Sequence, residues 1–221
     1  MIQAATLKFL KDLQKNNNKE WFDNNRKSYE NAKNDFLEFT QQLITGVSKF
    51  DSNIASANLD PKKCITRLNR DVRFSADKSP YKTNFFLMLN QGGKKSNNAC
   101  YYLQLQPDNT FTGGGMYMPM PPDLQKFRQE IDYNFAEWKK IVETKPFKKV
   151  FEKGVQSPET LSRPPKGFEA ESPAIEYLKM KGYFTMNQFT DTELQSKTVI
   201  KTILQNFETA KPMIDFLNRA L

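Results

Sequence analysis

Histidine is missing from the whole 221-residue chain. It is the commonest general base at neutral pH and the commonest transition-metal ligand, so any catalysis must use carboxylates, Lys, Tyr, Ser, Thr or an oxygen-liganded metal ion. Cysteine is scarce as well, because Cys64 and Cys100 are the only two. Two thiols cannot complete a zinc site, and we expect both to be reduced and packed rather than joined in a disulfide. The sequence therefore predicts no metal site.

Long apolar runs are also missing. No window approaches the roughly 18 apolar residues of a membrane span, and residues 1–9 lack the basic stretch and apolar core of a secretion signal. No convincing linker divides the chain, and its length suits one hydrophobic core. We therefore expect one domain over residues 1–221, located in the cytoplasm and without membrane contact.

Basic residues outnumber acidic ones and give a formal net charge of +8. Such a charge favours acidic partners through long-range attraction. Of the 33 basic residues, however, only seven are arginines, and the lysines are scattered over the expected helix surfaces. No nucleic-acid-binding motif accompanies the charge, so the composition favours a solvated basic surface over a nucleic-acid partner.

Apolar periodicity predicts an α+β fold. A short helix at residues 4–13 is followed by a single long one, capped by an Asn of residues 16–18, whose apolar stripe runs from Phe22 to Phe50. Segments rich in aromatic and aliphatic residues then alternate with turn signals. They predict strands at residues 64–74, 84–90, 99–106 and 110–118, with the last two joined as a hairpin.

Helical periodicity returns after Pro121 and Pro122. It predicts a helix ending near Phe135, then helices at residues 136–151, 174–181 and 192–221, with a break or new start at Pro212. Residues 183–189 are expected as a strand, and residues 152–172 as a long loop that acts as a lid or a wrapping segment. The expected architecture is an antiparallel sheet of about four or five strands packed against a long N-terminal helix and C-terminal helices.

Three of the seven arginines lie within seven residues, at Arg67, Arg70 and Arg73. If the segment is extended, Arg67 and Arg73 share one polar face with Asp71. Guanidinium groups this close repel one another unless carboxylates or a bound anion lie between them, and arginine suits forked recognition of carboxylate or phosphate. One interpretation is an anion site. The other is an internal ion-pair network with Asp71 and Asp77 that stabilises the following turn.

Two other features add candidate residues. Arg26 interrupts the apolar stripe of the long helix three residues before Tyr29, so it either snorkels over apolar surface or lines the same cavity as the arginine cluster. Gly113, Gly114 and Gly115 follow one another inside an expected strand. A bulge without a ligand is the favoured interpretation, and binding of an anion by successive amides is the alternative.

Arg163 lies in the long loop, next to two prolines. The prolines stiffen the backbone and hold Arg163 and Lys166 at fixed positions. This suits either a lid over a site or a structural brace, and the brace is slightly favoured.

Several motifs together carry a family resemblance that covers nearly the whole chain. They are Asn17-Asn18-Lys19-Glu20-Trp21-Phe22 with Arg26 and Tyr29, Arg70-Asp71-Val72-Arg73-Phe74-Ser75-Ala76-Asp77-Lys78-Ser79-Pro80-Tyr81-Lys82, Gly113-Gly114-Gly115-Met116-Tyr117-Met118-Pro119 followed by Leu124, Arg128 and Ile131, and Arg163-Pro164-Pro165-Lys166-Gly167. In this combination the chain resembles the conserved hypothetical proteins designated domain of unknown function 2461. The resemblance implies that these residues belong to the motifs of that family, and it implies no particular activity, substrate or cofactor.

Two hypotheses on function follow from these residues. In the first, a small molecule bearing a phosphate or carboxylate binds in an arginine-rich pocket between the sheet and the long helix, with or without a reaction. In the second, the protein is a nonenzymatic module whose aromatic and basic surface binds a protein or single-stranded nucleic acid. A third interpretation makes the arginine clusters purely structural.

The candidate residues divide by role. The candidate acid–base residues are Asp71, Asp77, Tyr81 and Lys82. An aspartate inside an arginine cluster is usually ionised and weakly basic, which weakens the case for an enzyme. The residues expected to contact the ligand are Arg26, Tyr29, Arg67, Arg70, Arg73, Lys78, Gly113, Gly114, Gly115 and Arg163.

Overall fold

The computed structural model describes residues 1–93 and 96–221. The helices of this part of the chain are α1 (Ala4–Lys15), α2 (Lys19–Asn24), α3 (Arg26–Val47), α4 (Ser52–Ser56), α5 (Pro61–Cys64), α6 (Pro121–Tyr133), α7 (Phe135–Val142), α8 (Lys145–Val150), α9 (Ile175–Leu178), α10 (Asp191–Leu194) and α11 (Val199–Arg219). Its strands are β1 (Phe85–Leu89), β2 (Cys100–Leu105), β3 (Thr110–Met116) and β4 (Tyr183–Phe189). The expected α+β fold is confirmed.

The four strands form one antiparallel sheet in the order β1-β2-β3-β4. They confirm four of the five expected strand segments, each to within two residues at either end. The hairpin between β2 and β3 is also confirmed, with Asp108 in the left-handed conformation that a tight connection requires. Gly113 faces Tyr102 on one side and Met186 on the other, and the pairing on both sides of β3 continues without a skipped residue.

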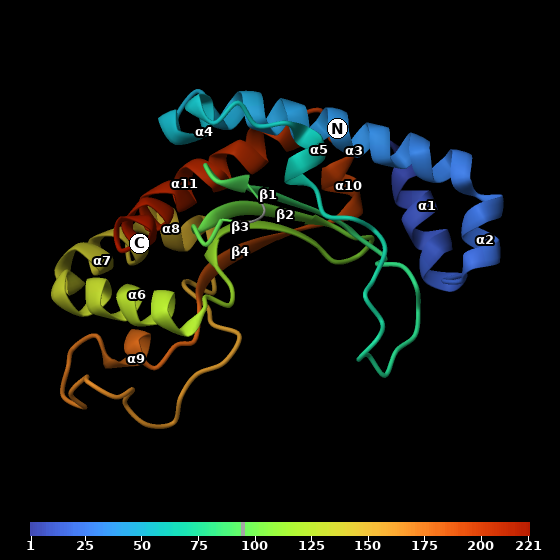
Figure 1. The fold of residues 1–221 in the computed structure, drawn as a ribbon. Coiled ribbons are helices and arrows are strands. Elements are labelled where there is room, and N and C mark those ends of the chain that lie inside the picture. Colours follow the sequence, from blue (N-terminus) through green and yellow to red (C-terminus); the bar gives the residue numbers. More distant parts are fainter. Residues whose placement is uncertain (94–95) are drawn as a thin grey trace.

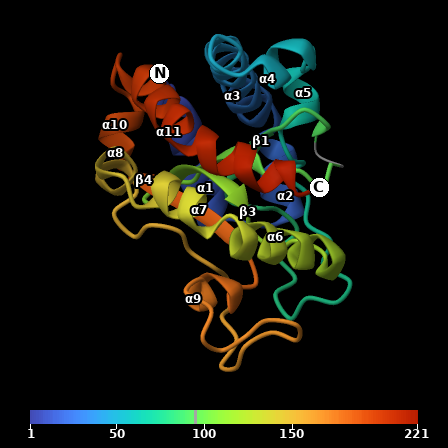
Figure 2. The same cartoon turned by 90° about the vertical axis from the view of Figure 1, so that its left-hand side faces the viewer.

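Helices α3 and α11 cover one face of the sheet (Figures 1 and 2). Phe36 of α3 stacks on Phe85 of β1 with 5.2 Å between ring centroids, and Phe207 of α11 lies 5.3 Å from Tyr101 of β2. Each fully buried aromatic ring stabilises the fold by about 1.5–3 kcal/mol relative to an exposed one. These side chains belong to the main core between the sheet and the two helices, and an arginine-rich pocket at that place stays a prediction.

The other face of the sheet carries a smaller apolar cluster. Cys100, Tyr102 and Phe184 are buried there, and half-buried side chains such as Phe86 and Phe111 pack against them. Figure 1 shows the sheet as an arch, with α6 and α9 below one end and α1 and α2 beyond the other. The coil of residues 66–83, which we call the arginine loop, projects beside α2 (Figure 1).

The strand expected at residues 64–74 is wrong. Asp60 caps a short helix, α5, that has Pro61 at its start, so the segment begins in a helix. Between α5 and β1 the described backbone forms only isolated β-bridges, one of them between Asn69 and Tyr81. The arginines therefore lie on a loop, and the expected division into a polar and an apolar strand face does not apply to them.

The long N-terminal helix is confirmed as α3, but Asn25 separates its expected first turns as α2. The Asn25 side chain donates to the carbonyl of Trp21 at 2.8 Å, and the Asn25 backbone leaves the helical region. Such local side-chain bonds compete with the helix ladder. The expected Asn cap is confirmed, since Asn18 accepts a hydrogen bond from the amide of Trp21 at 2.9 Å.

Two further helices differ from expectation. Thr144 caps α8, with Pro146 in the first turn, so the helix expected at residues 136–151 becomes α7 and α8. Pro212 does not break α11. It lies on the exposed side of the helix, where the carbonyl of Glu208 can bond to water instead of to an amide.

The remaining expectations concern the cysteines and the long loop. Cys64 and Cys100 are buried thiols. Between α8 and α9 the backbone forms only isolated bridges, such as the one between Gln156 and Phe184, so residues 152–172 are a loop as expected. None of the described helices combines the length and apolar character that crossing a bilayer requires.

Candidate functional site

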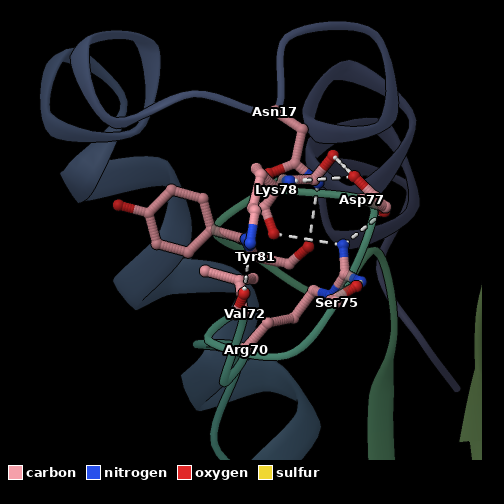
Figure 3. A network of polar contacts seen from close by, with 8 residues as sticks. Asn17, Arg70, Val72, Ser75, Asp77, Lys78 and Tyr81 are labelled. Atoms are coloured by element: carbon pink, nitrogen blue, oxygen red, sulfur yellow. Dashed lines mark hydrogen bonds and ion pairs between the residues drawn. The ribbon is translucent and has the colours of Figure 1, made fainter.

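Arg70 organises the arginine loop from inside (Figure 3). Its Nη1 donates to the carboxylate of Asp77 and, at 3.1 Å, to the carbonyl of Ser79. Its Nη2 donates to the hydroxyl of Ser75 at 3.3 Å. One guanidinium thus joins three points of the loop, and the internal ion-pair interpretation describes Arg70 well.

Asp77 completes this network. Its Oδ1 accepts hydrogen bonds from the amide of Ser79 at 2.9 Å and from the Ser79 hydroxyl at 2.6 Å. Together with the bond from Arg70, these contacts lower the pKa of Asp77 to about 2. Asp77 is therefore ionised at neutral pH and is a weak base, which does not favour its candidate role in acid–base catalysis.

The base of the loop is fixed to the N-terminal helices. Asn17 donates to the carbonyl of Tyr81 at 2.8 Å and accepts from the Tyr81 amide at 3.1 Å. The buried Tyr81 ring stacks on Phe22 of α2, with 4.0 Å between centroids and 18° between planes. Burial raises the pKa of Tyr81, so its phenol is neutral at physiological pH. These contacts give the loop a rigid footing.

The tip of the loop is exposed. Arg73 pairs with Asp71 through two hydrogen bonds, Nε to Oδ1 at 2.9 Å and Nη2 to Oδ2 at 2.7 Å. This pair lowers the pKa of Asp71 and raises that of Arg73. The neighbouring Phe74 is 95% exposed, and the Arg73 guanidinium lies 5.8 Å from its ring centroid. The loop therefore presents an aromatic ring and a cation side by side.

Three more cations belong to the same loop. Arg67 is exposed and Lys82 is half-buried, and neither forms an ion pair in the part of the chain that the structure describes. Burial lowers the pKa of Lys82, and the nearby charge of Arg67 adds to this effect. Lys78 is exposed and donates to the carbonyl of Val72 at 3.1 Å. The loop thus has more cations than its two aspartates neutralise.

Arg26 and Tyr29 lie close to the footing of the loop. The exposed Arg26 guanidinium lies over the Phe22 ring at 5.4 Å, and its charge reaches both Tyr29 and Tyr81. The half-buried Tyr29 ring contacts Phe22 at 5.0 Å. Because Arg26 packs over an aromatic ring and stays open to solvent, the snorkelling interpretation is confirmed, while contact with a ligand stays a prediction.

The three glycines belong to β3 and are not part of the arginine loop. A Cβ atom on Gly113 would lie 1.8 Å from the carbonyl oxygen of Thr185 and 2.9 Å from the hydroxyl of Tyr102. The Tyr102 hydroxyl donates to the Thr185 carbonyl at 2.6 Å. Because Gly113 has no side chain, the Tyr102 side chain can pass over β3 to reach that carbonyl. The favoured bulge is wrong, because the pairing of β3 is continuous. Close approach of another chain segment explains the glycines instead.

Arg163 is exposed in the coil between α8 and α9. Figure 1 shows this coil below one end of the sheet and the arginine loop below the other, so the structure does not bring Arg163 to the loop. Five of the cavities in the described part of the chain have linings that include none of Arg67, Arg70 and Arg73. Among the described residues, no group of three or more Cys, Asp and Glu side chains is placed to hold a metal ion.

Arg128 and Arg219 lie outside the predicted site and line cavities, and Arg128 is the buried one. Arg128 of α6 is 8% exposed and borders a cavity of about 510 Å³. A signal for it exists in the sequence, because Arg128 follows Leu124 by four residues and precedes Ile131 by three, on the apolar side of the helix. Arg128 was not predicted as a site residue because no other arginine lies near it in the sequence.

Comparison with known proteins places the chain in a family. No curated protein and no solved structure matches it. The family model described as "Conserved hypothetical protein (DUF2461)" matches residues 5–216, nearly the whole length. The chain therefore belongs to the conserved hypothetical protein family DUF2461.

Proposed function

We propose that the protein is a nonenzymatic binding module whose arginine loop takes up single-stranded nucleic acid. The observation that carries this proposal is the Phe74 ring, which is 95% exposed beside the Arg73 guanidinium at the tip of the loop. Aromatic rings on which bases stack, next to cations that follow the phosphate backbone, are the shared features of proteins that bind single strands.

Rigidity of the loop supports this proposal. An exposed Phe on a mobile loop would lose conformational entropy on binding, which opposes association. Here the Arg70–Asp77 network and the Asn17–Tyr81 hydrogen bonds hold the loop before any partner arrives. The loop backbone that carries the ring is therefore held in place before binding.

The charges of the loop fit a polyanion. Arg67, Lys78 and Lys82 have no carboxylate partner in the described part of the chain, so phosphates can pair with them without displacing one. Arg73 does have a partner, Asp71, but both side chains are exposed, and such surface pairs exchange readily. An open surface of this kind suits an extended chain better than a small metabolite, which needs walls on several sides.

Fluorescence anisotropy with a labelled single-stranded oligonucleotide of about 12 nucleotides tests the proposal. We expect binding at low salt that weakens linearly on a logarithmic scale as salt rises. Phe74→Ala should weaken binding at least about fivefold, since stacking of one base contributes about 1–3 kcal/mol. Arg73→Ala should lower the slope against salt by about 0.7.

Tyr133→Ala is the matched control, because Tyr133 is 82% exposed on α6, away from the loop. It should leave oligonucleotide affinity unchanged. The proposal fails if the wild-type protein does not bind at low salt, or if Phe74→Ala and Tyr133→Ala have the same effect.

A further inference from the structure

Arg128 is a buried cation without a carboxylate. Its Nη2 donates to the carbonyl of Met180 at 3.0 Å, whereas its buried Nε has no hydrogen-bond partner. None of the ion pairs in the described part of the chain includes it. Burying a guanidinium in this state is costly, so an anion that reaches Arg128 gains a strong partner.

The side chain of Tyr183 contacts Arg128 and is not an anion. Burial raises the pKa of Tyr183, and the charge of Arg128 and a hydrogen bond from it oppose that rise. The phenol therefore stays neutral at physiological pH, and it donates its own proton to the carbonyl of Tyr177 at 3.0 Å. Among the described residues Arg128 therefore has no ion-pair partner.

Arg128 borders the cavity of about 510 Å³ between the end of β3, the start of α6 and the coil before α9. Its other walls are mainly apolar and include Tyr117, Met118, Leu124 and Leu161. Glu159 and Lys181 also line the cavity, and they form an ion pair with each other. The volume lies within the range of about 300–1,000 Å³ that is typical of small-molecule sites.

The glycine-rich motif builds one wall of this cavity. β3 ends at Met116, directly after the three glycines, and Tyr117 and Met118 continue from it. A Cβ atom on Gly182 would lie 2.0 Å from the carbonyl oxygen of Tyr117, so Gly182 allows the coil before β4 to hold the Tyr117 backbone closely. Tyr117 and Met118 are largely exposed and available to an apolar ligand.

We propose that this cavity binds a small organic anion, with its carboxylate or phosphate on Arg128 and its apolar body against Tyr117, Met118 and Leu161. This site is separate from the arginine loop, and the two proposals rest on different residues. Figure 1 shows α6 and α9 at one end of the sheet and α1 and α2 at the other. Loss of one binding activity therefore leaves the other open to measurement.

Octanoate and 1-octanol are suitable probes, because they share an apolar chain and differ in the charged head. The protein is labelled with ¹³C at its methionine methyl groups, and both compounds are titrated while NMR spectra and the thermal midpoint are recorded. We expect octanoate to shift the Met118 signal and raise the midpoint, with the exposed Met1 signal unchanged. Octanol should bind at least about tenfold more weakly than octanoate, because the charge-assisted hydrogen bond to Arg128 is lost.

Arg128→Leu should abolish the preference for octanoate over octanol, and Lys201→Leu, which removes an exposed charge from α11, should keep it. If Arg128→Leu does not fold, Leu161→Trp tests the same cavity by filling it, and octanoate should then no longer shift Met118. Equal affinity for the two probes, no shift of Met118, or an unchanged preference in Arg128→Leu would overturn the proposal. Unchanged octanoate binding in Leu161→Trp would also overturn the proposal.

Discussion

Arg70 donates to Asp77, Ser75 and the Ser79 carbonyl, so its guanidinium holds the arginine loop closed on itself. Arg73 instead pairs with one aspartate on an exposed surface. At the residue scale, the same side-chain type therefore has two roles within four positions. Arg70 acts through the shape of the loop, whereas Arg73 is free to contact a partner directly.

The pKa of Asp77 predicts how the loop responds to acid. Its folded-state pKa of about 2 lies below the ordinary value of 3.8, so the folded protein binds fewer protons than the unfolded chain between these values. The stabilisation from Asp77 is complete above pH 3.8 and is lost as pH falls through 2. We expect a carboxyl ¹³C titration of Asp77 with a midpoint near 2, and loss of protection of the Ser79 amide over the same range. A midpoint at or above 3.8 would contradict the network, and Asp77→Asn should remove this pH dependence.

At the scale of elements, β3 pairs with β2 and β4 and packs against α11. Gly113 makes room for the Tyr102 hydroxyl on one face, and Gly114 lies against α11 on the other, where a Cβ atom would meet Ile214 at 2.7 Å. Strands usually avoid glycine, because it has no side chain to pack and loses much entropy on folding. In this sheet the close approach of β4 and α11 compensates for that loss.

Gly113→Ala tests this account by urea unfolding. The added methyl group collides with the backbone of β4, which cannot move as a side chain can, so we expect a loss of about 3 kcal/mol in the free energy of unfolding. Gly154→Ala is the matched control, because Gly154 has a φ of 62° but no neighbour near its Cβ position, and it should cost only about 1 kcal/mol. Equal losses in the two variants would show that close approach is not the reason for Gly113.

At the scale of the whole molecule, one hydrophobic cluster joins the two ends of the structure. It includes Phe9, on which Trp21 of α2 stacks, and the fully buried Trp138 of α7. A continuous core of this kind favours cooperative unfolding, and a single domain over residues 1–221 stays a prediction until it is measured.

The two tryptophans allow that measurement. Trp21→Phe leaves Trp138 as the fluorescent reporter of the α7 end, and Trp138→Phe leaves Trp21 as the reporter of the N-terminal end. Within each variant we expect the urea transition seen by fluorescence to coincide with that seen by far-ultraviolet circular dichroism. Separate midpoints in either variant would indicate two units that unfold independently.

The sequence by itself determined most elements of the fold. Alternating and helical apolar patterns are local properties, so β1 to β4, α1 and the Asn18 cap could be predicted within about one turn. Errors arose where one side chain changes the local backbone. Asn25 divides a helix through its bond to Trp21, and the segment with Arg70 folds on itself rather than extending.

Only the tertiary structure decided which arginines have compensated charge. Residues Arg67, Arg70 and Arg73 stand out along the chain because they are neighbours, yet the partners of a guanidinium depend on distances that spacing does not determine. Arg128 stands alone in the sequence, and its burial beside a cavity arises from segments more than 30 residues away, such as Leu161 and Met180. Patterns along a chain indicate which side of a helix is apolar, but burial, cavity shape and ion pairing require contacts between distant segments.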